Sequence, residues 1–253
     1  METSRRPVAD LSPALKELAD TRAALHRLIA YTVSPAREAL TGRIGLRAAP
    51  GAIATPLFGD DEIRLAIQGD ELVRASNGSS ERRSITTLTE AADFLAVELD
   101  ATRSQRVDVP PIGNPDEKLA VDADASRWLA AWFGFGDSVL EGMRAGATAE
   151  EDVTVPQLWP EHFDIAIVAG VEDRGQRANY GFSPGDNFID EPYLYVGPWN
   201  TDGLDDEFWE GETWAPMRLN QLLDTDDRRA SALAFLRQGR DVLRSRVRRM
   251  GHL

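Results

Sequence analysis

The sequence has no cysteine and only three histidines among its 253 residues. Without cysteine there are no disulfides, thiolate metal sites or cysteine nucleophiles, and we expect a cytoplasmic location. A long apolar run is also missing, because the most apolar stretch, around residues 128–135, is far too short to cross a bilayer. The chain starts Met-Glu-Thr-Ser-Arg-Arg, which lacks the apolar core of a secretion signal, so we expect no secretion.

Basic residues are outnumbered by acidic residues in this chain. Lysine and arginine number 28 against 42 aspartates and glutamates, which gives a formal net charge of −14. Such a charge repels nucleic-acid phosphates, so we predict no nucleic-acid partner. Six arginines between residues 237 and 249 are the exception, and we interpret them as cations suited to the end of a helix. Hydrophobic residues at 42% and charged residues at 28% are typical of a soluble globular protein without a membrane partner.

The first half of the chain changes from helical to strand-like spacing. Apolar residues recur at helical spacing over 15–33, with His26 at the margin of the stripe, where we interpret it as a packed edge residue. Short strands are then predicted, and Gly69-Asp70 between two of them predicts a hairpin turn. Residues 76–80 are interpreted as an exposed loop before a helix capped by Thr89. The strands are expected at 43–46, 52–57, 63–67 and 72–75, and the helix at 90–99.

The second half repeats this order of elements. A helix with an aromatic stripe is predicted from residue 122, and its glycines weaken it enough that packing must hold it. Strand-like runs and a final helix follow, so we predict an α+β fold in which a helix, an antiparallel strand meander and a helix occur twice. We expect the strands at 153–159, 163–169, 177–183 and 192–196 and the last helix at 226–248. The predicted division is an N-terminal half at 1–105, a linker at 106–121 and a C-terminal half at 122–253.

The strands of the C-terminal half carry the candidate site. Alternation along strand 163–169 sends Phe163, Ile165 and Ile167 to one face, where Tyr180 and Phe182 of the next strand belong as well. The opposite face keeps polar and small residues, which leaves volume for a ligand. The predicted ligand-binding residues are His162, Asp164, Asn179, Ser183, Asp186, Tyr193 and Tyr195.

The chemistry of these residues favours binding of a small polar or cationic molecule. His162 and Asp164 lie roughly 7 Å apart along an extended strand, close enough to grip one molecule between tyrosine walls. We predict no metal and no cofactor, because histidine pairs with zinc-ligand spacing and glycine-rich phosphate loops are missing. Carboxylates around the site leave a magnesium or calcium site as the open alternative.

Two other functions fit the sequence. The first is a hydrolase in which His162 is the general base oriented by Asp164, with Ser183 as the nearby serine, although no nucleophile elbow surrounds it. The second is a protein-interaction module that uses the acidic, aromatic loop Asp202–Trp214, which otherwise is a solvated loop with two aromatic anchors. In the last helix, Arg240 falls within the apolar stripe and requires either an anion, Asp164 or Asp186, or a path to solvent beside Gly239.

Three segments of the C-terminal half stand out as strand motifs: Phe163–Ala166, Ser183–Asp186 and Pro192–Tyr195. They resemble the successive strand motifs of an uncharacterised bacterial family classed as a domain of unknown function. The final helix around residues 232–243 is also similar. His162 departs from the family pattern, and the resemblance implies no activity.

Overall fold

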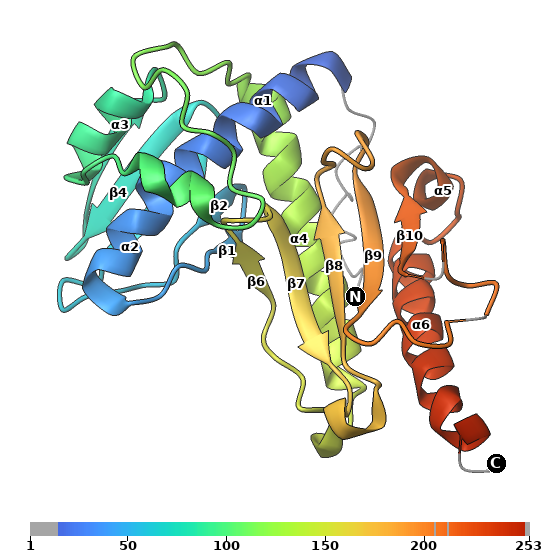
Figure 1. The fold of residues 1–253 in the computed structure, drawn as a ribbon. Helices are drawn as coiled ribbons and strands as arrows, with labels where there is room; N and C mark the ends of the chain where they lie inside the picture. The colour runs from blue at the N-terminus through green and yellow to red at the C-terminus, as the bar shows by residue number, and fades with distance from the viewer. Residues whose placement is uncertain (1–14, 205, 212, 251–253) are drawn as a thin grey trace, which may run out of the picture.

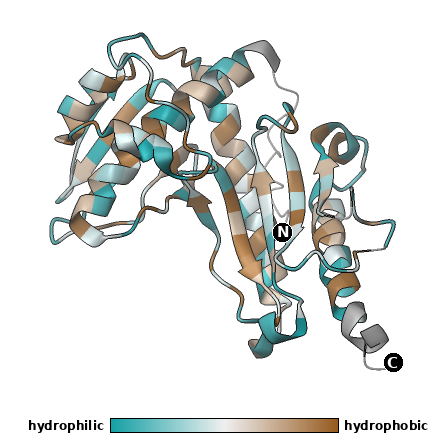
Figure 2. Ribbon diagram, in the orientation of Figure 1, coloured by the Kyte–Doolittle hydropathy of each residue, from teal (hydrophilic) through white to brown (hydrophobic). Residues whose placement is uncertain are grey.

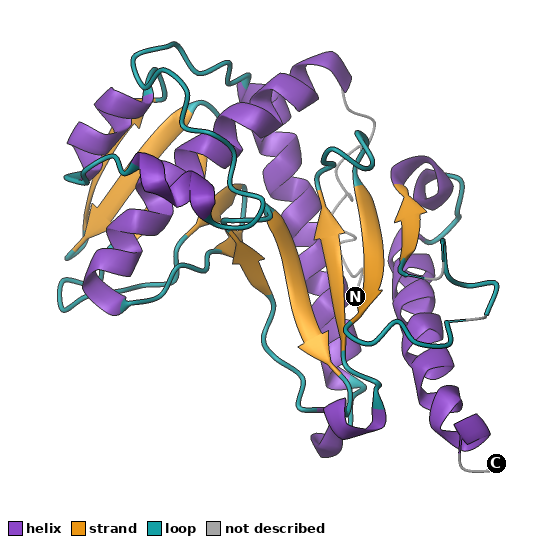
Figure 3. Ribbon diagram, in the orientation of Figure 1, coloured by secondary structure: helices purple, strands orange, loops and turns teal. Residues whose placement is uncertain are grey.

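The structure is a computed structural model that describes residues 15–204, 206–211 and 213–250 (Figure 1). It confirms the α+β fold, with a helix, a strand meander and a helix in each half (Figure 3). The first half consists of α1 (Leu15–Leu28), the π-helical segment Ile29–Val33, α2 (Ser34–Thr41), β1 (Arg47–Ala49), β2 (Ala52–Ala54), β3 (Arg64–Gln68), β4 (Glu71–Ser76), β5 (Ser79–Ser84) and α3 (Leu88–Leu95). The second half consists of α4 (Ala123–Ala145), β6 (Gln157–Trp159), β7 (Asp164–Ala169), β8 (Ala178–Ser183), β9 (Tyr193–Pro198), β10 (Ala215–Arg218), α5 (Leu219–Leu223) and α6 (Arg228–Met250).

The strands form two antiparallel sheets, each with its strands in chain order. Sheet B contains β1 to β5, and sheet A contains β6 to β10. Leu46 and Leu158 join the neighbouring edges through two backbone hydrogen bonds of 2.7 and 3.0 Å. The halves therefore build two sheets that meet at a single bridge.

Several strand boundaries differ from the sequence prediction. The Gly69-Asp70 turn is confirmed, since Gln68 and Glu71 pair on either side of it. Residues 77–80 are exposed as predicted, but a loop over 76–80 was wrong in extent, because Asn77-Gly78 alone is the two-residue turn of a second hairpin and β5 follows it. Alternation of apolar and polar residues could not reveal β5, because all six of its residues are polar and exposed. The short strand β10 was not predicted either.

Helix α4 packs against both sheets and holds them around one apolar core (Figures 1 and 2). Gly136 permits this approach, because a Cβ at this position would lie 2.8 to 3.0 Å from the side chains of Phe182 and Ile165. Trp132, one turn earlier, donates from Nε1 to the carbonyl of Ser183 at 2.9 Å. The glycine that weakens the helix locally is thus the point where strands β7 and β8 contact it.

The predicted linker is an ordered crossover that runs along α1. Arg27 donates to the carbonyl of Ile112, and the Tyr31 hydroxyl donates to the carbonyl of Pro110 at 2.7 Å. Thr21 accepts from the backbone N–H of Asp122 at 2.9 Å, directly before α4. The apolar core extends across this segment, and the division of the chain at 106–121 stays a prediction. None of the described helices has the length and apolar character needed to cross a membrane.

Two glycines of α4 provide a matched test of this packing. Gly136→Ala places a Cβ against Phe182 and Ile165, so we expect a loss of about 1–3 kcal/mol in the free energy of unfolding. At Gly134 a Cβ meets no atom within 4 Å, so Gly134→Ala is expected to stabilise the protein by up to about 1 kcal/mol through helix propensity. Urea denaturation measures both changes. A Gly136→Ala protein as stable as Gly134→Ala would contradict the close contact.

Candidate functional site

Sheet A has one covered face and one open face. α4 packs on β7 and β8 and α6 packs on β9, and Figure 1 views the sheet from the other side, with the strands in front of α4. The prediction that bulky apolar groups of the two strands share one face is confirmed for the four that lie in β7 and β8, since strand register places them together and all are fully buried, whereas Phe163 belongs to the preceding turn. The four are Ile165, Ile167, Tyr180 and Phe182. We call the opposite side the open face, because the helix contacts of α4 and α6 lie on the other side; several of its side chains are nevertheless buried. The open face carries Asp164, Ala166, Asn179, Gly181, Ser183, Tyr193 and Tyr195.

Asp164 is a buried carboxylate on the open face, with 5% of its surface exposed. Its Oδ2 accepts a hydrogen bond from the Tyr195 hydroxyl, whereas its Oδ1 has no hydrogen-bond partner among the described residues. Tyr195 lies opposite Gly181 in register, and a Cβ on Gly181 would come within 2.6 Å of the tyrosine ring. The ring therefore occupies the space that the small residues were expected to leave for a ligand, and this expectation was wrong.

The electrostatics of this pair follow from its burial. Burial raises the pKa of Asp164 to about 6, against the opposing effects of the Tyr195 hydrogen bond and the nearby His162. Burial and the neighbouring Asp164 charge raise the pKa of Tyr195 well above its ordinary value. The carboxyl group thus titrates near neutral pH while the phenol keeps its proton.

A second tyrosine–carboxylate pair lies beside the first. The Tyr193 hydroxyl donates to Asp186 Oδ2, and Asp186 Oδ1 accepts the backbone N–H groups of Phe188 and Ile189 at 2.7 and 3.0 Å. The two tyrosine rings have centroids 6.1 Å apart, and Trp214 packs edge-on against Tyr193 at 5.6 Å. Both tyrosines are therefore fixed by carboxylates, and Tyr193 is buried as well.

His162 lies on the turn between β6 and β7, outside the strand. Phe163 has a φ of 53° and ends this turn, so β7 begins at Asp164 and not at the predicted Phe163. The Nδ1 of His162 is 2.8 Å from Oδ2 of Asp108, and its side chain is 49% exposed. The predicted grip between His162 and Asp164 is thus replaced by two separate pairs, His162–Asp108 and Asp164–Tyr195.

Helix α1 positions both turns at this end of sheet A. The Nε2 of His26 lies 2.9 and 3.1 Å from the carbonyls of Glu161 and Pro160, so it must donate a hydrogen, and the ring stacks on Phe163 at 5.4 Å. Arg22, one turn earlier, donates to the carbonyl of Asp190 at 2.7 Å. Burial lowers the pKa of His26 to about 4. In the sequence, the only feature that distinguished His26 was its position beside the apolar stripe of residues 15–33.

The remaining predicted residues are engaged with neighbours. Asn179 accepts from Trp199 Nε1 at 3.0 Å, towards the opposite end of β8. Ser183 is 3% exposed, and its Oγ accepts the backbone N–H of Gly185 at 3.1 Å. A buried acceptor of this kind is badly placed for nucleophilic attack. The structure therefore brings Asp164, Tyr193 and Tyr195 together and leaves Asn179 apart.

The acidic, aromatic loop turns its aromatic side chains inward. Phe208 packs on Phe235 of α6 with centroids 5.2 Å apart, and Trp209 is buried. Glu210 lies 3.5 Å from Arg218. Asp205 and Glu212 of this loop lie outside the described residues. The two rings are anchors to the core, and a partner for the loop stays a prediction.

Arg240 in α6 does not use either of the predicted anions. Its guanidinium donates to the carbonyl of Gly146 at 3.4 Å and lies 3.5 Å from the Asp241 carboxylate. The buried Glu151, whose pKa Arg240 helps to lower, pairs with Arg244 at 2.7 Å. Of the two alternatives drawn from the sequence, the pairing of Arg240 with Asp164 or Asp186 is therefore wrong, because those carboxylates lie on the other face of sheet A.

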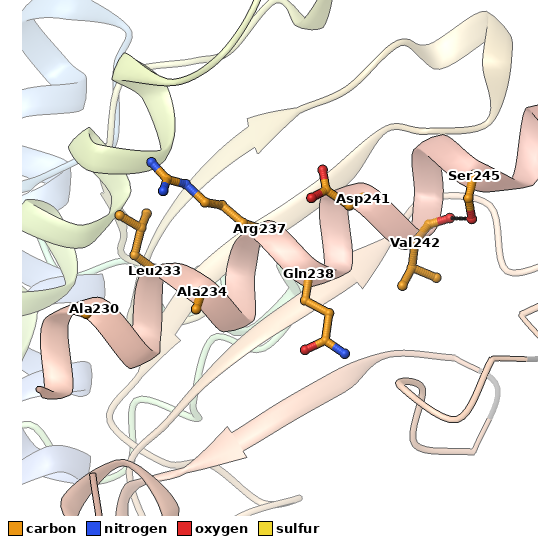
Figure 4. A pocket seen from close by; sticks show the side chains of 8 residues that line it. All are labelled: Ala230, Leu233, Ala234, Arg237, Gln238, Asp241, Val242 and Ser245. Carbon is orange, nitrogen blue, oxygen red and sulfur yellow. Dashed lines mark hydrogen bonds between the residues drawn. The ribbon is translucent and has the colours of Figure 1, made fainter. Parts of the chain in front are cut away.

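Two hollows lie away from the open face. One, of about 670 Å³, follows the side of α6 from Ala230 to Ser245 (Figure 4). The other, of about 520 Å³, lies between the end of α4 and residues 147–153. Neither is lined by a predicted site residue. Within the described part of the chain, no three His, Asp or Glu side chains gather closely enough to hold a metal ion.

The neutral state of His26 predicts a pH-dependent stability. Between pH 6.5 and about 4 the unfolded chain binds a proton at His26 that the folded chain excludes, so stability falls as the pH is lowered. His26→Gln keeps an N–H donor and removes this titration. We expect the wild type to lose stability relative to His26→Gln by up to about 1.4 kcal/mol per pH unit, measured by urea denaturation. A difference that does not change with pH would contradict the assignment.

Comparison with known proteins adds no identification. No family model, no curated protein and no solved structure matches the chain. The resemblance to an uncharacterised bacterial family stays a prediction from the sequence.

Proposed function

We propose that this protein binds a small cationic molecule on the open face of sheet A, beside Asp164 and Tyr195. The observation that carries the proposal is the Oδ1 atom of Asp164, which is buried and lacks a hydrogen-bond partner among the described residues. Leaving such an acceptor unpaired costs about 1–3 kcal/mol, and more when it is charged. A ligand N–H group that reaches Oδ1 removes this cost.

A cation suits the site better than a neutral donor. An ammonium or guanidinium group supplies both a hydrogen and the charge that a buried carboxylate requires. Asp108 and Asp186 add negative charge around Asp164, and their partners are a histidine and a tyrosine. The tyrosine ring beside the carboxylate also attracts cations through its face.

Binding requires Tyr195 to move. Oδ1 of Asp164 is shielded from solvent, and the Tyr195 hydroxyl covers the other oxygen. The ring lies directly on the backbone of Gly181, where a Cβ would come within 2.6 Å of it, so a ligand reaches Asp164 only if this side chain rotates away and its hydrogen bond to Oδ2 breaks. We expect the ring to swing off Asp164 and to pack against the ligand.

Three simple cations test the proposal. Ethylammonium and methylguanidinium carry N–H donors, whereas tetramethylammonium has none. We expect the first two to bind the wild type at least tenfold more tightly than the third, because only they satisfy Oδ1. Asp164→Asn should lose this preference, and the exposed Asp173→Asn should keep it. NMR titration measures the affinities, and circular dichroism establishes that each variant is folded.

The pH dependence of the same titration has a definite sign. The cation binds the ionised carboxylate, whose pKa is about 6. Affinity should therefore be constant above this pH and fall by about tenfold per unit below it. Equal binding of all three cations, or unchanged binding by Asp164→Asn, would rule out Asp164 as the anchor.

A second candidate function is hydrolysis with His162 as general base. The 2.8 Å contact between His162 Nδ1 and Asp108 favours it, because a carboxylate in this position orients the ring and leaves Nε2 to accept a proton. Asp108 takes the orienting role that the sequence assigned to Asp164. Since Ser183 is buried and engaged, the base would activate water.

A screen of chromogenic esters and amides tests this alternative. If the wild type is active, His162→Ala should lower kcat/KM by about 10²–10⁴, and Asp108→Asn should lower it less and alter the pH profile. The melting temperature should change little, because the His162 side chain is half exposed and that of Asp108 more so. Absence of turnover in the wild type, or full activity in His162→Ala, would eliminate it.

The cellular location is also part of the proposal. The absence of cysteine supports a cytoplasmic location, where thiols would remain reduced and disulfides are rare. A small cationic metabolite is an available ligand in that compartment.

A further inference from the structure

Strand β5 ends sheet B with an unpaired edge. It pairs with β4 on its inner side, and in the described part of the chain no strand pairs with its outer side. All six of its residues are exposed, and proline is absent from it. An edge of this kind presents a row of backbone donors and acceptors that another strand can use.

The hairpin register shows which residues direct their backbone groups outward. Ser76 pairs with Ser79 across the two-residue turn, and the N–H of Ile85 donates to the carbonyl of Asp70 at 2.8 Å. Residues 79, 81, 83 and 85 therefore face β4 with their backbone groups. The N–H and C=O groups of Ser80, Arg82 and Ser84 point away from the sheet.

We infer that β5 pairs antiparallel with β5 of a second copy of this chain. A two-fold axis perpendicular to the sheet keeps each side chain on its face, so opposed residues must both be odd-numbered or both even-numbered. An axis through Arg82 satisfies this condition and joins the outward backbone groups of residues 80, 82 and 84. Glu81 then lies opposite Arg83 of the second copy, twice, and Ser80 lies opposite Ser84 twice.

Side-chain charge favours this register over the one centred on Glu81. Centring the pair on Glu81 would oppose two glutamates and leave both Arg83 side chains opposite serines. Centring it on Arg82 forms two Glu81–Arg83 pairs, and each central Arg82 is already neutralised by Glu71 of its own chain at 2.9 Å. Arg83 lies over the ring of Phe94 in α3 at 5.9 Å, which holds its guanidinium at this face. The strand is therefore complementary to itself in one register.

The interface is small. A six-residue strand is about 20 Å long, and strand pairing alone falls at the low end of the areas that specific interfaces bury. We expect a reversible dimer with a dissociation constant on the order of micromolar or weaker. In this dimer sheet B continues from one copy into the other.

Sedimentation equilibrium over a range of concentrations tests the dimer, with variants of β5 as the discriminating step. Glu81→Arg should weaken association at least tenfold, and the charge-swapped Glu81→Arg/Arg83→Glu protein should regain affinity close to that of the wild type. Arg82→Pro removes an outward N–H and leaves the bonds to β4 intact, so it should abolish dimerisation, whereas Arg82→Ala should not.

Two results would overturn the inference. One is a wild type that stays monomeric at every concentration reached. The other is a dimer whose affinity is unchanged in Arg82→Pro, which would place the interface elsewhere. The melting temperature of each variant, taken at a concentration where the wild type is monomeric, distinguishes loss of pairing from loss of folding.

Discussion

The close packing of α4 against both sheets is the constraint on which the rest of the structure depends. Gly136 lets the helix touch Phe182 and Ile165, while other α4 residues pack on β1 and β2. In the described part of the chain, the backbones of the two sheets are hydrogen-bonded to each other at the Leu46–Leu158 bridge, and α4 adds packing contacts with strands of both halves. Because α4 and α6 occupy the same side of sheet A, polar groups of that sheet collect on the other side.

On the open face, carboxylates are paired with tyrosine hydroxyls that come from β9. Asp164 and Asp186 each accept a tyrosine hydroxyl from β9, and these bonds fix the rings beside the carboxylates. The Asp164 pair is incomplete, because one carboxylate oxygen has no hydrogen-bond partner within the described residues. A buried polar group of this kind is costly for folding and valuable for recognition, which is why the functional proposal rests on it.

Local patterns in the sequence predict much of the fold and less of the site. Helical and alternating spacing located the long helices and placed Ile165, Ile167, Tyr180 and Phe182 on one face. The partner of His162 is Asp108, 54 positions earlier in the chain, and no local pattern encodes such a contact. Likewise, small residues on a strand suggested a hollow, but filling of the space above Gly181 by a tyrosine depends on cross-strand register.

Two polar side chains of α1, Arg22 and His26, hold the two turns that border the tyrosine–carboxylate pairs. Arg22 and His26 are four residues apart, about 6 Å along a helix axis, and each binds the backbone of a different turn of sheet A. The separation of those two turns is therefore set by the fixed rise of α1 between Arg22 and His26. A change in the number of residues between Arg22 and His26 would therefore shift one of these turns relative to the other.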